Sequence, residues 1–88
     1  MTTSTATVTI RYFAAARAAA GVEIEPLELP DGATVDDVLA AVRTRHGAEL
    51  ARVLDRCSFL LDEVAVRDRA TTVPPGATVD VLPPFAGG

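Results

Sequence analysis

The two glycines at the end of the chain are the residues most open to a chemical role. The last six residues are Pro83-Pro84-Phe85-Ala86-Gly87-Gly88. Glycine offers no side chain to pack and loses more conformational freedom on folding than other residues. One interpretation is a disordered terminus, which is common. The other is that the Gly88 carboxylate is the reactive group and the rest of the chain presents it. The sequence has no lysine, so an activated acyl group at Gly88 meets no side-chain amine on its own domain.

The composition limits the kinds of partner that the chain can bind. Its 88 residues make one domain. The net charge of −4 and the dispersed arginines argue against nucleic acid. No stretch is long and apolar enough to cross a membrane, and the N-terminus does not resemble a signal peptide. The single cysteine, Cys57, excludes an internal disulfide and fits a reducing compartment such as the cytoplasm.

The polar residues do not form a catalytic set. The sequence has no Ser/His/Asp arrangement, no phosphate-binding glycine loop and no metal-ligand spacing, so we expect no bound metal or cofactor. We expect His46, at a helix end, to have a structural role. Cys57 is expected to be a small buried hydrophobe, because a persulfide relay would need exposure near the tail. The acidic pairs at 36–37 and 62–63 fit a helix start and a turn.

The hydrophobic pattern predicts an α+β domain. Residues 7–13 alternate as in a strand, and an alanine-rich helix over 14–20 stops at Gly21. Residues 34–46 form the clearest helix, with Thr34 as its N-cap and one apolar stripe. The other predicted elements are strands at 22–29, 57–61, 64–66 and 78–82 and a short helix at 49–55. The main helix is expected to cover one face of a mixed four- to five-stranded sheet.

Three further expectations concern the edge strand, the bounds of the domain and one face of the sheet. Pro26, with a shift of apolar phase after it, predicts a bulged edge strand. We expect residues 1–82 to form the domain, with 1–6 frayed, and residues 83–88 to protrude as a tail. Three apolar side chains share the face opposite the one that the main helix covers, and they are Phe13, Leu60 and Leu82. That patch is either a docking surface beside the tail or is covered by the alanine-rich helix.

Three stretches resemble a known family. The first is residues 10–17, a strand that opens into a helix, and the second is the helix opening at residues 30–35. The third and most specific is residues 75–88, a closing strand followed by Pro-Pro-x-x-Gly-Gly. The chain is similar in these stretches to the ubiquitin-like sulfur carriers of the β-grasp fold. It most closely resembles the small subunit of molybdopterin synthase.

This resemblance implies a carrier rather than a catalyst. Gly88 would be adenylated by a separate activating enzyme that uses ATP and then thiocarboxylated. The sulfur would go to a pterin precursor held by the large synthase subunit, in the biosynthesis of the molybdenum cofactor. The side-chain-free Gly87 and Gly88 would enter the partner's channel. The rest of the tail would contribute to partner binding through Pro83, Pro84, Phe85 and Ala86. Phe85 either docks in the partner or packs on its own domain.

The sequence departs from the family pattern at two places. Arg67 stands where relatives often carry asparagine, and Phe85-Ala86 replaces a frequent valine-serine. These changes leave other sulfur acceptors open, namely cysteine, thiamine, tRNA or a secondary metabolite. A ubiquitin-like modifier joined to target lysines, or a purely binding β-grasp module, is the alternative outside sulfur chemistry.

Overall fold

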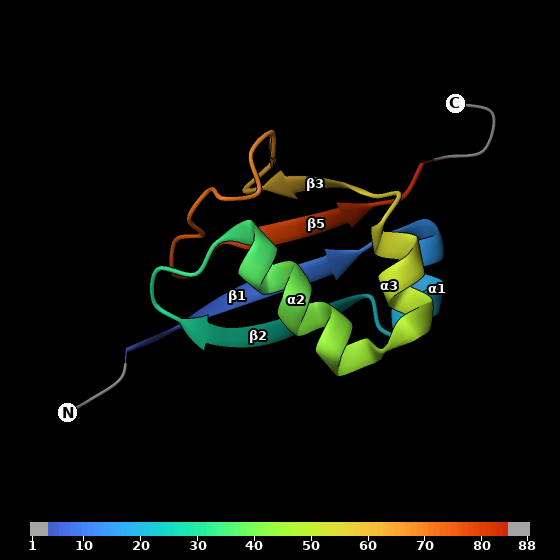
Figure 1. Cartoon of the computed structure of the whole chain (residues 1–88), viewed down its shortest axis with the longest axis horizontal. Coiled ribbons are helices and arrows are strands. Elements are labelled where there is room, and N and C mark those ends of the chain that lie inside the picture. Colours follow the sequence, from blue (N-terminus) through green and yellow to red (C-terminus); the bar gives the residue numbers. More distant parts are fainter. Residues whose placement is uncertain (1–3, 85–88) are drawn as a thin grey trace.

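A five-stranded mixed sheet forms the centre of the protein. The computed structural model describes residues 4–84. The strand order is β2-β1-β5-β3-β4; β1 and β5 run parallel, and the other neighbours run antiparallel. Figure 1 shows α2 crossing one face of the sheet, with α1 and α3 at one end of it. The elements are β1 Thr5–Tyr12, α1 Ala14–Ala20, β2 Ile24–Pro30, α2 Val35–His46, α3 Ala48–Leu54, β3 Ser58–Leu61, β4 Val64–Ala65 and β5 Thr78–Leu82.

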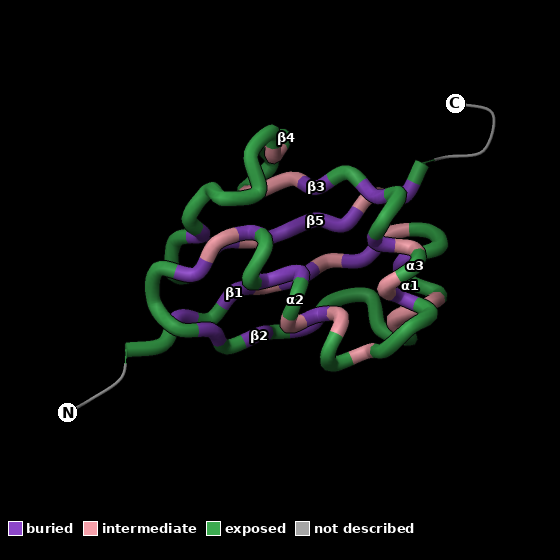
Figure 2. The backbone as a smooth tube through the Cα atoms, viewed as in Figure 1, coloured by how far each residue is buried: buried purple, intermediate pink, exposed green. Residues whose placement is uncertain are grey.

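The core lies between α2 and the sheet, as predicted from the apolar stripe of this helix. The stripe is fully buried, and its members are Val35, Val38, Leu39 and Val42. Thr34 caps the helix: its Oγ1 accepts the amide N–H of Asp37, whose carboxylate accepts the amide N–H of Thr34. Figure 2 shows buried residues along the middle of β1 and β5. The predicted α+β fold class is therefore confirmed.

Two expectations about the N-terminal half are wrong. β1 begins at Thr5, and the pairing of Ala6 with Leu29 shows that the chain is not frayed up to residue 6. β2 is an edge strand without a bulge, because its register with β1 is continuous from Thr5↔Pro30 to Arg11↔Ile24. The division between a domain at 1–82 and a tail at 83–88 stays a prediction, since residues 85–88 lie outside the described chain.

A buried carboxylate explains the false bulge. Glu25 is only 7% exposed and points to the core side of β2, whereas Ile24 is 55% exposed. Glu25 Oε2 accepts a hydrogen bond from the Tyr12 hydroxyl at 2.5 Å and lies 2.5 Å from His46 Nε2. Arg45 Nε lies 3.4 Å from Oε1. Because these partners satisfy the carboxylate, Glu25 can occupy a core-facing position of β2, where an apolar residue is usual.

The same cluster shifts two pKa values. Burial raises the pKa of Glu25, but the hydrogen bonds from Tyr12 and His46 and the charge of Arg45 outweigh it, so that the net pKa lies below its ordinary value. Burial and the hydrogen bond to Glu25 raise the pKa of Tyr12 well above its ordinary value. The depressed pKa of Glu25 means that its contribution to stability is present above the pKa of the unfolded chain. That contribution is lost as the pH falls through the lower, folded pKa.

We predict that Tyr12→Phe lowers the free energy of unfolding at neutral pH by about 2 kcal/mol, because a hydrogen bond to a buried charge is lost. Urea unfolding between pH 3 and pH 7, a range spanning the ordinary carboxyl pKa, measures the change. The pKa of Glu25 should rise in the variant, which makes the acid-side loss of stability shallower than in the wild type. Equal free energies for both proteins across this range would contradict the cluster's role.

The β3–β4 hairpin turns on two non-glycine residues with positive φ. Asp62 has φ 46° and Glu63 has φ 71°, and Leu61 pairs with Val64 around them. Positive φ at both loop positions is the pattern of a type I′ turn, which favours glycine at its second position. Asp62 has a compensating role, since its Oδ1 accepts the amide N–H of Thr78 at 2.9 Å.

Glu63→Gly is expected to raise the free energy of unfolding by about 1 kcal/mol, because glycine adopts positive φ without the Cβ clash. Glu63→Ala is the matched control: it removes the same charge but keeps the Cβ. Chemical unfolding should show a gain for the glycine variant alone. An equal gain for both variants would assign the effect to charge rather than to backbone strain.

Candidate functional site

The central strand of the sheet holds the base of the tail. β5 pairs with β1 on one edge and with β3 on the other, so backbone hydrogen bonds fix both sides. After Leu82, which is half-buried, Pro83 is buried and Pro84 is exposed. The remaining predicted site residues of the tail lie outside the described chain, and they are Phe85, Ala86, Gly87 and Gly88. A rigid base therefore leads directly into the segment predicted to be reactive.

The three predicted docking residues lie on the face of the sheet that α2 leaves open. Leu60 pairs with Asp80, and the amide N–H of Phe13 donates to the carbonyl of Val81 at 3.2 Å, which places Phe13 beside the end of β5. Phe13, Leu60 and Leu82 are each half-buried, so α1 does not cover them completely. The predicted phase is confirmed, because Tyr12, Phe59 and Val81 are 1%, 4% and 0% exposed on the other face.

An ion pair lies between these apolar residues, and sequence reasoning missed it. Arg11 donates two hydrogen bonds to the Asp80 carboxylate, at 2.6 Å from Nε and 2.7 Å from Nη2. The Asp80 side chain is 5% exposed and that of Arg11 is 41% exposed. The Arg11 guanidinium also lies 5.7 Å from the centre of the Phe13 ring. The bidentate contact ties β1 to β5 and holds the Arg11 guanidinium near Phe13 on the open face.

The hydrogen bonds of this pair, with the charge of Asp80, raise the pKa of Arg11 above its ordinary value, so the arginine stays protonated. One sequence signal pointed to the pair. Asp80 interrupts an otherwise apolar strand, which implies a partner for its carboxylate. Arg11 could be identified as that partner only from the parallel register of β1 and β5, which matches Arg11 with Asp80.

Comparison with known proteins identifies the family to which this domain belongs. The ThiS family profile matches residues 10–88. The molybdopterin synthase sulfur carrier subunit of Chlamydomonas reinhardtii is 37% identical over 82 residues, which span 92% of this chain and 98% of that protein. The chain belongs to the ThiS family. This finding confirms the identification of the chain with the ubiquitin-like sulfur carriers.

Solved structures agree with this family and with the β-grasp fold. The putative molybdopterin converting factor subunit 1 of Pyrococcus furiosus is 29% identical, with a TM-score of 0.79 and coverage of 91% of this chain and 99% of that one. SAMP1 of Haloferax volcanii is 25% identical, with a TM-score of 0.83 and coverage of 93% and 99%. The predicted β-grasp architecture is thereby confirmed.

The side chains of this ThiS-family chain that are most capable of chemistry are occupied in structural contacts. Cys57 is 8% exposed, and its Sγ donates to the Val53 carbonyl at 3.2 Å. Burial raises the pKa of the Cys57 thiol, which disfavours the nucleophilic thiolate. His46 is held by Glu25 inside the core cluster. Neither side chain is available to attack a substrate at the tail.

The described part of this ThiS-family chain contains no metal-binding cluster. Across residues 4–84 no group of three His, Cys, Asp or Glu side chains could hold a metal ion. Over the same range, no helix is both long enough and apolar enough to cross a membrane. The features that remain for function are the open face and the base of the tail.

Proposed function

We propose that this chain is a sulfur carrier whose C-terminal Gly88 is converted to a thiocarboxylate. The observation that carries the proposal is the position of the Gly-Gly end. It follows the central strand of a ThiS-family β-grasp domain, which is paired on both edges, by way of Pro83 and Pro84. The 37% identity to a molybdopterin synthase sulfur carrier subunit supports the same role. The cytoplasmic location expected from the sequence stays a prediction.

The proposed chemistry begins with activation, because a free carboxylate is a poor electrophile. On a separate activating enzyme, the Gly88 carboxylate attacks the α-phosphorus of ATP, and pyrophosphate leaves. A sulfide or persulfide sulfur then attacks the acyl carbon of the adenylate, and AMP leaves. With a persulfide donor, a thiol breaks the remaining S–S bond and takes up the other sulfur. The products are a thiocarboxylate at Gly88 and, in that case, a disulfide on the donor enzyme.

The proposed acceptor is a pterin precursor held by the large subunit of a molybdopterin synthase. The thiocarboxylate sulfur attacks an electrophilic carbon of the precursor and displaces an oxygen leaving group from it. Water then hydrolyses the resulting thioester, which leaves the sulfur on the precursor and returns the Gly88 carboxylate. This chain acts as a co-substrate subunit in that reaction. By family analogy we propose a heterotetramer of two small and two large subunits.

The tail suits insertion into a narrow channel. Six extended residues reach at most about 20 Å. Gly87 and Gly88 lack side chains and therefore need the least room. Pro83 and Pro84 restrict the backbone, which lowers the entropy lost when the tail enters a partner. Phe85 and Ala86 are proposed to set the depth of insertion. The open-face residues Phe13, Leu60 and Leu82 are proposed to contact the large subunit.

Mass spectrometry of the C-terminal peptide tests this proposal. The chain is incubated with the activating enzyme of its own organism, ATP and a sulfide source. The expected product carries the mass of one sulfur in place of one oxygen, located at Gly88. Reactions without ATP are the control and should leave the mass unchanged. An unchanged mass in the complete reaction would overturn the proposal.

A ubiquitin-like modifier is the second candidate, and one comparison favours it. SAMP1, to which the chain is 25% identical, is named in a second structure as the small archaeal modifier protein 1 of the same organism. A modifier would form an amide between Gly88 and a target lysine, with loss of AMP from the same adenylate. Higher-mass adducts that contain a Gly-Gly-modified lysine would identify this function. A free thiocarboxylate would identify the carrier.

A further inference from the structure

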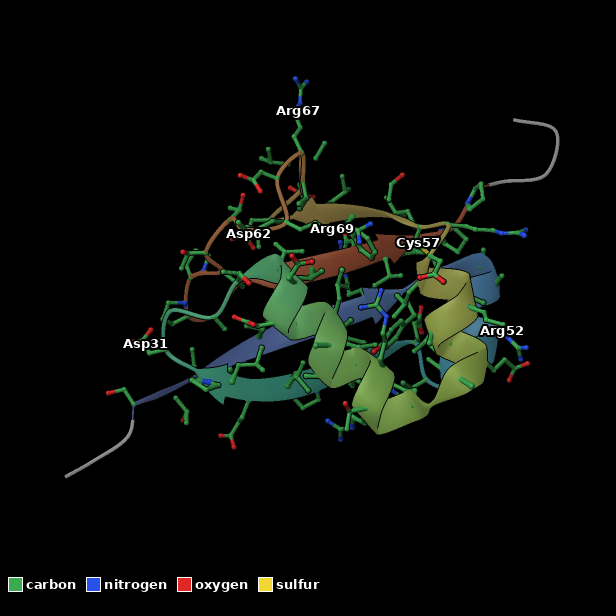
Figure 3. The ribbon with its side chains drawn as sticks, viewed as in Figure 1. Asp31, Arg52, Cys57, Asp62, Arg67 and Arg69 are labelled. Atoms are coloured by element: carbon green, nitrogen blue, oxygen red, sulfur yellow. The ribbon has the colours of Figure 1, made fainter. Side chains whose placement is uncertain are left out.

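Two arginines stand beside the base of the tail. Arg52 lies in the last turn of α3, and Arg56 follows one helical turn later. Both are exposed, and Figure 3 shows the Arg52 side chain projecting away from the body of the protein. Although the chain has a net charge of −4, this part of its surface presents positive charge.

Arg52 and Arg56 line an open groove of about 510 Å³ that begins at the tail. Pro83 and Pro84 form one side of this groove, and Ala15 and Val53 contribute apolar surface. A groove with apolar walls and cationic groups suits a protein segment that carries carboxylates, because both its side-chain carbons and its charges find contacts.

Arg52 and Arg56 lack the partners that other arginines have. Four arginines form ion pairs with acidic residues, and these pairs are Arg11–Asp80, Arg17–Glu23, Arg43–Asp55 and Arg45–Glu25. Asp55, which also lines the groove, lies 3.7 Å from Arg43. Within residues 4–84, neither Arg52 nor Arg56 makes an ion pair. Their charge is therefore available to a partner.

The groove lies where a protein that encloses the tail would make contact. Residues 85–88 are bonded directly to Pro84, so any protein that encloses them must come close to Pro84. The rim of such a channel then faces Arg52 and Arg56. The large subunit is the proposed recipient of the tail. The groove adjoins the base of the tail, so it would form part of the surface that contacts this subunit.

We infer that Arg52 and Arg56 form a recognition site for acidic side chains at the mouth of the large subunit's channel. This inference rests on the proposed function. Bidentate contacts between guanidinium and carboxylate groups would orient the domain as the tail enters. Charges at the rim of an interface chiefly raise the association rate, and salt weakens their effect.

The test is the association rate constant of the cognate large subunit with the Arg52→Glu/Arg56→Glu double variant, measured by stopped-flow at low and high salt. We expect this rate constant to fall by roughly tenfold or more at low salt, with a much smaller difference at high salt. The Arg52→Ala/Arg56→Ala variant should show a smaller reduction in the same direction. Thermal melts of each variant check that the domain remains folded.

Arg67→Glu is the matched control, because Arg67 is exposed in the loop after β4 and does not line the groove. It makes the same change in charge per residue and should leave the rate constant near that of the wild type. Equal rate constants for the groove and control variants would overturn the inference and leave the sulfur-carrier function standing. So would a reduction that salt does not change. A wild-type chain that does not bind the large subunit would overturn both proposals.

Discussion

Removal of Gly87 and Gly88 is expected to abolish sulfur transfer completely while the domain stays folded. The reactive carbon in our account is the carboxyl carbon of Gly88, and a shortened chain ends at Ala86. Its carboxylate is then displaced by two residues, or about 7 Å of extended chain, and carries a methyl group where the channel is proposed to admit none. A displacement of this size exceeds the roughly 1 Å misplacement that already costs about a hundredfold in rate.

Two measurements determine the effect of the deletion on sulfur transfer and on folding. The first is thiocarboxylate formation with the activating enzyme and ATP, and the second is the thermal midpoint of the domain. Deletion of Thr2 and Thr3 is a control of equal length at the other end of the chain, and it should keep full activity. Sulfur transfer that persists without Gly87 and Gly88 would mean that the tail is not the carrier. Retention of every function of the protein would favour a binding module.

Loss of two apolar side chains from the open face should weaken binding of the large subunit by about a hundredfold. We expect this result for Phe13→Ala combined with Leu60→Gln, because two central apolar contacts at about 1.4 kcal/mol each lower the affinity by that factor. Both residues are only half-buried in the free domain, so the fold should tolerate the changes. Titration of the large subunit with each variant measures the dissociation constant.

Val64→Gln supplies the control for this second prediction. Val64 is 69% exposed and pairs with Leu61, one position along from the Leu60↔Ala65 pair. Neighbouring positions on a strand point to opposite faces, so Val64 lies on the face opposite Leu60. The control should bind like the wild type. If the double variant and the control bind equally well, the open face is not the docking surface.

Local sequence patterns predicted most of the elements. The stripe of α2 and its capping box are local features, because both depend on residues within a few positions of each other. The Asp62–Glu63 turn between β3 and β4 was likewise predicted from adjacent residues. The strand phases correctly separated Leu60 from Phe59 and therefore the open face from the core face.

The features that the sequence did not reveal depend on contacts between distant residues. The bulge predicted at Pro26 is wrong because Glu25 faces the core, where its partners Tyr12 and His46 are 13 and 21 positions away along the chain. The pairing of Arg11 with Asp80 spans 69 positions and follows from a parallel register that no local pattern specifies. The groove beside the tail brings α1, α3 and the end of β5 together, so it is visible only in the folded domain.

A single-turnover reaction tests whether Gly88 delivers its sulfur to the pterin. Purified chain carrying the Gly88 thiocarboxylate is mixed with the large subunit and the sulfur-free pterin precursor, without ATP or activating enzyme. We expect the thiocarboxylate to return to a carboxylate while a dithiolene forms on the pterin, with two carrier chains consumed for each product. Loss of the thiocarboxylate without sulfur on the pterin, or an unchanged thiocarboxylate in the complete mixture, would contradict it.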